Sequence, residues 1–178
     1  MSSVLDAVRQ QLGPDTIRQL SGALGADPAA TSHAISLALP ALLGGLAHNA
    51  AQPQGAAALD NALNQHDGSI LDNLGSMLGG TGSGGGALSS IGGAILGHVF
   101  GGRRGPVEEG VGKASGLDAA QVAQLMAMLA PIVMGVLGRM KQTKGLDANR
   151  LPGALNEGSQ DPGGGLGSIL GAIFGQKS

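Results

Sequence analysis

The chain of 178 residues contains no cysteine, tryptophan or tyrosine, and only two phenylalanines. Without cysteine it can form neither disulfides nor thiolate metal sites. Without large aromatic side chains, its core has to be filled by small aliphatic ones, so its structural elements must approach one another closely. The 34 glycines add to this expectation, because a helix face without side chains lets a neighbouring backbone come near.

Charge is also scarce. Charged residues make up 12% of the chain, about half of the usual share, and the formal net charge is −2. Because phosphate binding requires a stripe of Lys and Arg, we expect no nucleic-acid partner. The first residues do not resemble a secretory signal, since Asp6 and Arg9 interrupt their apolar pattern. The longest apolar runs, at 34–47 and 125–138, are shorter than the roughly twenty residues of a membrane-spanning helix. We therefore expect a cytoplasmic protein.

The apolar residues that are present recur with helical period. Val4, Val8 and Leu12 form one stripe, and further stripes follow along the chain. Asp27 and Pro28 supply an N-cap and a first-turn proline for a long helix. No segment alternates in the manner of a strand. The sequence predicts an all-α protein.

The chain also repeats itself with an offset of ninety-one residues. Repetition of this kind is typical of related units that share a core, so we predict two duplicated helical units packed on each other. The matched pairs are Gly25 with Gly116, Asp27 with Asp118, Pro40 with Pro131, Gly44 with Gly135 and Leu46 with Leu137.

Pro40 and Pro131 lie inside the two apolar runs. An interior proline removes one backbone hydrogen bond and clashes with the preceding turn. We expect each run to form a proline-broken, bent pair of helices that faces the shared core. The side chains predicted to be buried together are Leu39, Leu42, Leu43 and Leu46 with Leu129, Ile132, Val133 and Val136 or Leu137.

Composition divides the chain into four segments. The first helical unit spans 1–78, and a Gly/Ser-rich linker spans 79–90. A glycine-zipper segment and the second helical unit span 91–157, and a glycine-rich tail with a second zipper segment spans 158–178.

The zipper segments are GAILGHVFG at 93–101 and GSILGAIFG at 167–175, which share the pattern Gly-x-Ile-Leu-Gly-x-x-Phe-Gly. Glycines at i, i+4 and i+8 give a helix a groove in which another backbone can lie. Each interior glycine destabilises a helix by about 0.5–1 kcal/mol, so such a helix needs a partner. The candidate interaction residues are Gly93, Gly97, Phe100 and Gly101, and Gly167, Gly171, Phe174 and Gly175.

Three partners suit such segments. The rest of the protein could close over them, a second copy could pack on them, or a lipid surface could hold them. Neither segment has the cationic face of an interfacial helix, which disfavours the lipid surface. A tail without fixed structure is a further alternative for the last segment.

Catalytic patterns are not found. His33, His48, His66 and His98 lack the spacing of metal ligands. The polar cluster that begins at His66 is typical of a helix start, capped by Asp67 or Ser69. Nucleophile-elbow and phosphate-loop motifs do not occur. We predict no catalytic, cofactor or metal site.

The proline-centred runs, the segment ALDNALNQHDGSILDNL and GHVFGG together resemble the bacterial "domain of unknown function 937" family and its YidB-like relatives. The resemblance extends from about Leu20 to the end of the second unit. It implies an all-helical fold, and it supplies no activity and no catalytic residues.

From these observations we expect a non-enzymatic helical interaction or assembly module that forms homo-oligomers through its glycine-zipper segments. The first alternative is a peripheral membrane or envelope-associated protein with weak membrane contact. The second is a small-ligand binding protein.

Overall fold

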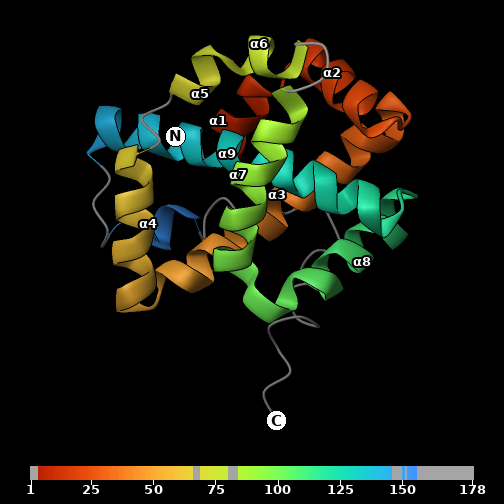
Figure 1. Ribbon diagram of the computed structural model, residues 1–178. Helices are drawn as coiled ribbons and strands as arrows, with labels where there is room; N and C mark the ends of the chain where they lie inside the picture. Colours follow the sequence, from red (N-terminus) through yellow and green to blue (C-terminus); the bar gives the residue numbers. More distant parts are fainter. Residues whose placement is uncertain (1–3, 66–68, 80–83, 146–149, 151, 156–178) are drawn as a thin grey trace.

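The protein is helical throughout the part of the chain that the computed structural model describes, residues 4–65, 69–79, 84–145, 150 and 152–155. No strand occurs among these residues, which confirms the all-α prediction. The elements, shown in Figure 1, are α1 (Val4–Gln11), α2 (Pro14–Leu24), α3 (Pro28–Ala50), α4 (Pro53–Gln65), α5 (Ser69–Asp72), α6 (Leu74–Gly79), α7 (Gly84–Phe100), the 3-10 turn η1 (Gly101–Arg103), α8 (Arg104–Ser115) and α9 (Ala119–Lys144).

The two longest helices, α3 and α9, form the centre of the molecule, and α9 contacts helices from both halves of the chain. In Figure 1, α7 runs down the front of the molecule and crosses α9, and α4 stands to its left. The α7–α9 pair is the most extensive helix contact in the fold. The rest of the described chain is wrapped around these central helices.

The core unites the two apolar runs, as predicted. Leu39 and Leu43 of α3 are fully buried, as are Leu129 and Val133 of α9. The same core cluster includes the other side chains predicted to meet there, Leu42, Leu46, Ile132, Val136 and Leu137. The burial prediction is therefore confirmed.

The helices do not break at their prolines, contrary to the sequence prediction. Pro40 lies inside the continuous helix α3, and Pro131 lies inside α9. Both prolines are buried among core side chains. An interior proline costs about 3 kcal/mol. Tertiary packing is the main source of helix stability, and here it surrounds both helices closely enough to keep them continuous.

Two similar joints lead into the long helices. Gly25 ends α2 in the left-handed conformation with φ 62°, and Gly116 ends α8 in the same way with φ 81°. Two residues later, Asp27 caps α3 by accepting from the Ala29 N–H, and Asp118 caps α9 by accepting from the Gln121 N–H. The joints lie ninety-one residues apart, the offset of the sequence repeat.

The linker is shorter than composition suggests. Helix α6 extends to Gly79, and α7 begins at Gly84, so residues 84–90 are helical instead of belonging to a linker over 79–90. Residues 80–83 lie outside the described chain. Glycine and serine are poor helix formers, but α7 packs along α9, and such packing outweighs intrinsic propensity.

Candidate functional site

Helix α7 carries the first zipper segment, and its inner side rests on the core. Leu96 is fully buried and Phe100 is 6% exposed. One turn before Leu96, a β-carbon on Gly92 would collide with the Ala127 carbonyl of α9. The absence of a side chain at Gly92 thus lets the backbones of α7 and α9 touch. This glycine lies outside the predicted zipper.

Within the described part of the chain, Gly93 and Gly97 of the predicted zipper have no close packing partner. A β-carbon on Gly93 or Gly97 would meet no atom within 4 Å. Gly101 falls in η1 with φ 53°, so it turns the chain out of α7 instead of extending the glycine row. Phe100 does not lie on the predicted interaction surface, because its ring packs against Gly45 of α3. A β-carbon on Gly45 would come within 2.6 Å of this ring.

The second zipper segment lies outside the described residues. Its predicted interaction residues are Gly167, Gly171, Phe174 and Gly175. The structure therefore places only the first segment.

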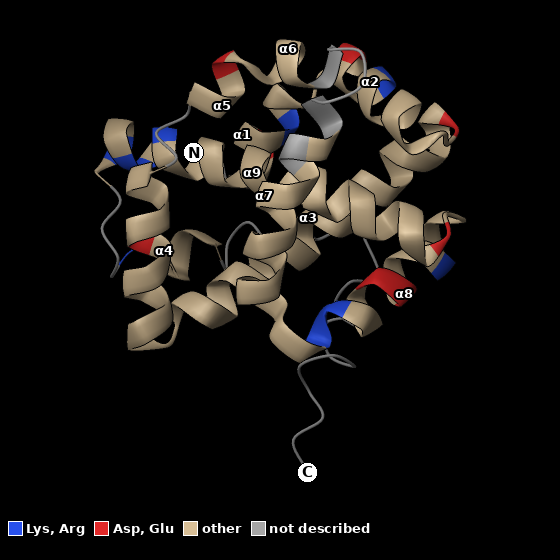
Figure 2. Cartoon of the chain, viewed as in Figure 1, with Lys and Arg blue, Asp and Glu red and all other residues tan. Residues whose placement is uncertain are grey.

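The exposed side of α7 presents a row of small residues, Gly86, Ser90, Gly93 and Gly97, which we call the small-residue face. At about 100° per residue, these four positions lie within about 60° of one another around the helix. The Ser90 hydroxyl donates to the Gly86 carbonyl at 2.9 Å, so it is satisfied within the helix. No Lys, Arg, Asp or Glu occurs in α7, as Figure 2 shows for the parts drawn in colour. A second helix could lie on this face without displacing a charge.

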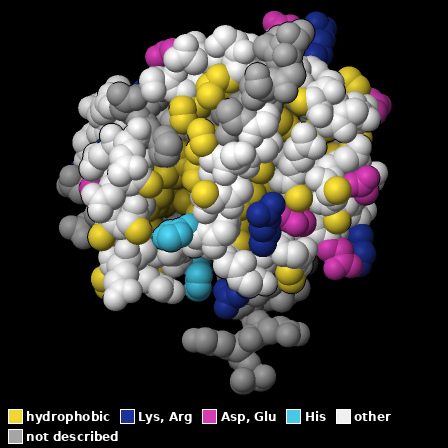
Figure 3. Space-filling view, in the orientation of Figure 1, with side chains coloured by type: hydrophobic (Ala, Val, Ile, Leu, Met, Phe, Trp, Pro, Cys, Tyr) yellow, Lys and Arg dark blue, Asp and Glu magenta, His cyan; other side chains and the backbone are white. Residues whose placement is uncertain are grey.

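The other flank of α7 borders a groove. An apolar depression of about 220 Å³ lies between α7 and α4, and it is visible in Figure 3 as hydrophobic side chains below the surface. Its floor includes the buried side chains of Leu46, Leu59 and Met134. Its walls are Ala94, Ile95, His98 and Val99 of α7, Ala58 and Ala62 of α4, and Asn49. We call it the α4–α7 groove.

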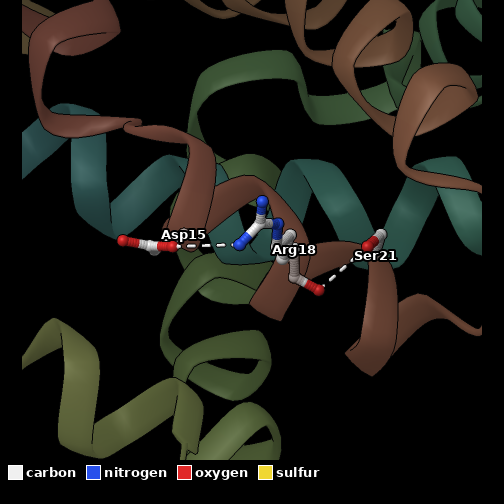
Figure 4. A network of polar contacts seen from close by, with 3 residues as sticks. All are labelled: Asp15, Arg18 and Ser21. Carbon is white, nitrogen blue, oxygen red and sulfur yellow. Dashed lines mark hydrogen bonds and ion pairs between the residues drawn. The ribbon is translucent and has the colours of Figure 1, made fainter.

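Among the described residues, no cluster of three or more His, Asp or Glu side chains could hold a metal ion. Figure 4 shows a typical surface network, in which Arg18 contacts Asp15 at 3.5 Å and Ser21 donates to the Arg18 carbonyl at 2.8 Å. Asp15 and Arg18 are exposed and Ser21 is buried, and these short-range contacts stabilise α2 locally. His66 and Asp67 lie outside the described residues.

The family described as "Bacterial protein of unknown function (DUF937)" matches residues 6–140, about three quarters of the chain. The chain belongs to this family. The match confirms the resemblance seen in the proline-centred runs. No curated protein and no solved structure matches this DUF937 member.

In the described part of this DUF937 member, two helices, α3 and α9, are long and apolar enough to cross a membrane by length and composition. In both, most of the apolar window is buried inside the fold, 61% in α3 and 78% in α9. Core helices pass the same test, so this finding is weak evidence for a membrane span. Helices α3 and α9 have 23 and 26 residues, so both are longer than the apolar runs at 34–47 and 125–138 that they contain. The sequence prediction considered only the length of those runs.

Sequence reasoning missed Gly92 and the α4–α7 groove. The signal for Gly92 was present, because it precedes Leu96 and Phe100 by four and eight residues and therefore lies on their apolar stripe. The groove had no such signal. It is formed by segments from α3, α4, α7 and α9 that only the fold brings together.

Proposed function

We propose that this DUF937 protein is a non-enzymatic assembly module that associates with further copies of itself through the small-residue face of α7. The observation that carries the proposal is the open space at Gly93 and Gly97, on a helix that Leu96 and Phe100 anchor to the core. A neighbouring helix can approach such a face closely without any rearrangement of the monomer.

Gly93, which is partly exposed, and Gly97, which is exposed, both weaken α7 as a helix. Each lowers the stability of α7 by about 0.5–1 kcal/mol relative to alanine. Among the described residues, neither glycine gains a close contact that an alanine would prevent. Close packing of a second helix gives these positions a contact that compensates the loss.

A second α7 is the partner that fits this face best. The face is uncharged and self-similar, so two copies can pair about a two-fold axis, which closes the assembly as a dimer. The tail segment at 167–175 has the same glycine pattern in its sequence, and we propose that it takes part as well. If both segments take part, head-to-tail contacts extend the assembly beyond a dimer.

The internal repeat belongs to the same proposal. The joints at Gly25 and Gly116, each followed by an aspartate cap, support a duplicated helix–turn–helix unit with an offset of ninety-one residues. On this proposal, each unit is followed by a glycine-rich segment with the zipper pattern. We propose a cytoplasmic location for the assembly and, from the low content of basic residues, no nucleic-acid partner.

A peripheral membrane role is the alternative, and α3 and α9 are the observation that favours it. The burial of α3 and α9 favours the assembly module, because the core would have to open before these helices could contact lipid. Vesicles distinguish the two proposals. An assembly module keeps its oligomeric state and stays in solution when neutral or anionic vesicles are added.

The decisive experiment is the native mass across protein concentration for the wild type and Gly97→Leu. Leucine blocks close approach while raising intrinsic helix propensity, so it separates packing from helix formation. We expect the wild type to associate as concentration rises, and Gly97→Leu to associate at least tenfold more weakly with unchanged helix content.

Gly105→Leu is the matched control. Gly105 is exposed on α8, and a β-carbon there also meets no atom within 4 Å, but it lies away from the small-residue face. This variant should assemble like the wild type. A wild type that stays monomeric at high concentration, or a Gly97→Leu variant that assembles equally well, refutes the proposal.

A further inference from the structure

The two walls of the α4–α7 groove are held on α9 independently of each other. Helix α4 is tied to α9 by the Lys141 ammonium, which contacts the Asp60 carboxylate at 2.5 Å and the Asn64 side-chain oxygen at 2.8 Å. Helix α7 is fixed to α9 where Gly92 meets the Ala127 carbonyl. Among the described residues, α4 and α7 share no extensive contact of their own. The width of the groove is therefore set by α9.

The side chains that line the groove keep it open. Three of the wall residues are alanines, at 58, 62 and 94, and an alanine side chain has no rotamer that swings into the space. On the floor, Leu46 and Met134 are 3% and 1% exposed, and they belong to the packed core. Apolar side chains that face such a space lack dispersion contacts on that side. An apolar molecule in the groove restores these contacts and releases water from the floor.

The size of the groove distinguishes a small molecule from a protein segment. The groove measures about 220 Å³. A cavity of about 150 Å³ with an aliphatic lining already holds benzene, so this groove has room for roughly six to eight carbon atoms. A single helical turn with its side chains, about 10 Å across and about 5.4 Å long, exceeds this volume. The groove is therefore suited to a small molecule and not to a helix.

The polar groups of the lining lie at one end of the groove and carry no carboxylate, ammonium or guanidinium. Among the described residues of the lining, the polar side chains are those of Asn49 and His98. Both also line a second, more polar depression that adjoins the groove, which places them at its border. An amide and an imidazole form hydrogen bonds with a hydroxyl group. This arrangement complements an uncharged molecule with an aliphatic chain and one hydroxyl.

We propose that the α4–α7 groove binds a free aliphatic alcohol of medium chain length. The chain lies over Leu46, Leu59 and Met134, and the hydroxyl lies at the end formed by Asn49 and His98. At about 100° per residue, the α7 positions that line the groove face a different direction from the small-residue face. The site therefore does not depend on self-association.

The first measurement is an NMR titration of the full chain with 1-octanol, followed through the methyl signals of methionine. Met134 lines the floor of the groove, so its methyl signal should shift saturably and show nuclear Overhauser contacts with the octanol chain. Met128 is fully buried but does not line the groove, so its signal is the internal control. From 1-hexanol to 1-octanol, affinity should rise about fourfold per added methylene. Because the ligand is uncharged, affinity should not fall with ionic strength.

A matched pair of variants locates the site. Ala58→Phe fills the groove from α4, whereas Ala57→Phe places the same side chain at an exposed neighbouring position. We expect Ala58→Phe to weaken octanol binding at least tenfold and Ala57→Phe to leave it unchanged. Circular dichroism shows whether each variant is folded. If Ala58→Phe does not fold, the contacts of octanol with Met134 in the wild type decide the question.

Four outcomes overturn the proposal. Without a saturable shift at Met134 there is no site, and equal effects of Ala58→Phe and Ala57→Phe place the ligand elsewhere. A fall in native mass when octanol is added assigns the groove to a second copy. Octanol binding that is seen only in Phe174→Ser assigns the groove to the last segment of the chain. Unchanged octanol binding in Gly97→Leu supports a site separate from the assembly surface.

Discussion

The carbonyl oxygen of Ala127 in α9 occupies the space into which a β-carbon on Gly92 of α7 would project. The two helices therefore touch backbone to backbone at this crossing. Since the α7–α9 contact is the largest in the fold, the position of α7 depends on the absence of a single side-chain atom. The next residue, Gly93, faces open space, so the same substitution at Gly92 and at Gly93 tests the crossing of the two helices directly.

Gly92→Ala should destabilise the protein, because α7 must move away from α9 to admit the methyl group. Overpacking of this kind costs about 1–3 kcal/mol. Gly93→Ala should raise the free energy of unfolding by about 0.5–1 kcal/mol through helix propensity alone. Urea unfolding at low protein concentration measures both. Equal effects of the two substitutions would contradict the crossing geometry.

Thr31→Val should leave stability unchanged or raise it by about 1 kcal/mol. The Thr31 side chain is fully buried in α3, and its hydroxyl has no hydrogen-bond partner among the described residues. A buried hydroxyl without a partner is unfavourable, and valine has the same shape without it. Thr31→Ser is the control, since it keeps the hydroxyl, loses a buried methyl group and should destabilise. A clearly destabilised Thr31→Val variant would reveal a partner for the hydroxyl.

Asp60→Ala should lower the free energy of unfolding by about 1 kcal/mol. The Lys141 ammonium of α9 contacts the Asp60 carboxylate at 2.5 Å and the Asn64 side-chain oxygen at 2.8 Å, which ties α9 to α4. The Lys141 and Asp60 side chains are 22% and 30% exposed, so water screens the pair only in part. In the exposed pair of Lys113 with Glu109, Glu109→Ala should have no measurable effect on thermal unfolding. The reverse order of the two effects would count against this assignment.

Lys113→Met should raise the pKa of Glu109 towards its ordinary value of 4.5. In the folded chain, the Lys113 hydrogen bond and then its charge lower that pKa. A lowered folded-state pKa favours the folded state above the unfolded-state pKa, and this contribution, which is too small to measure for so exposed a pair, is lost as pH falls through the folded-state pKa. Carboxyl chemical shifts in an NMR titration follow the change. Because the Glu109 side chain is 64% exposed, high salt should weaken the shift of its pKa in the wild type. An unchanged Glu109 pKa in the variant would show that Lys113 is not what lowers it.

Local signals in the sequence accounted for much of the fold. Asp27 and Pro28 marked the start of α3, and Gly25 and Gly116 marked the ends of the preceding helices, because capping depends on residues close in sequence. The behaviour of Pro40 could not be predicted in this way. Whether a proline breaks a helix depends on how much packing surrounds it, and that packing comes from residues far away in the chain.

The sequence by itself determined the helical class, the helix caps, the apolar runs that form the core and the membership of the DUF937 family. Only the tertiary structure decided that Gly92 packs on α9 while Gly93 and Gly97 stay open, and that Phe100 belongs to the core. Helical periodicity fixes the angle of about 100° between neighbouring residues, but it does not fix which side of the helix meets a partner. The packing of α7 against α9 decides which side meets a partner, and this packing brings together residues from separate parts of the chain.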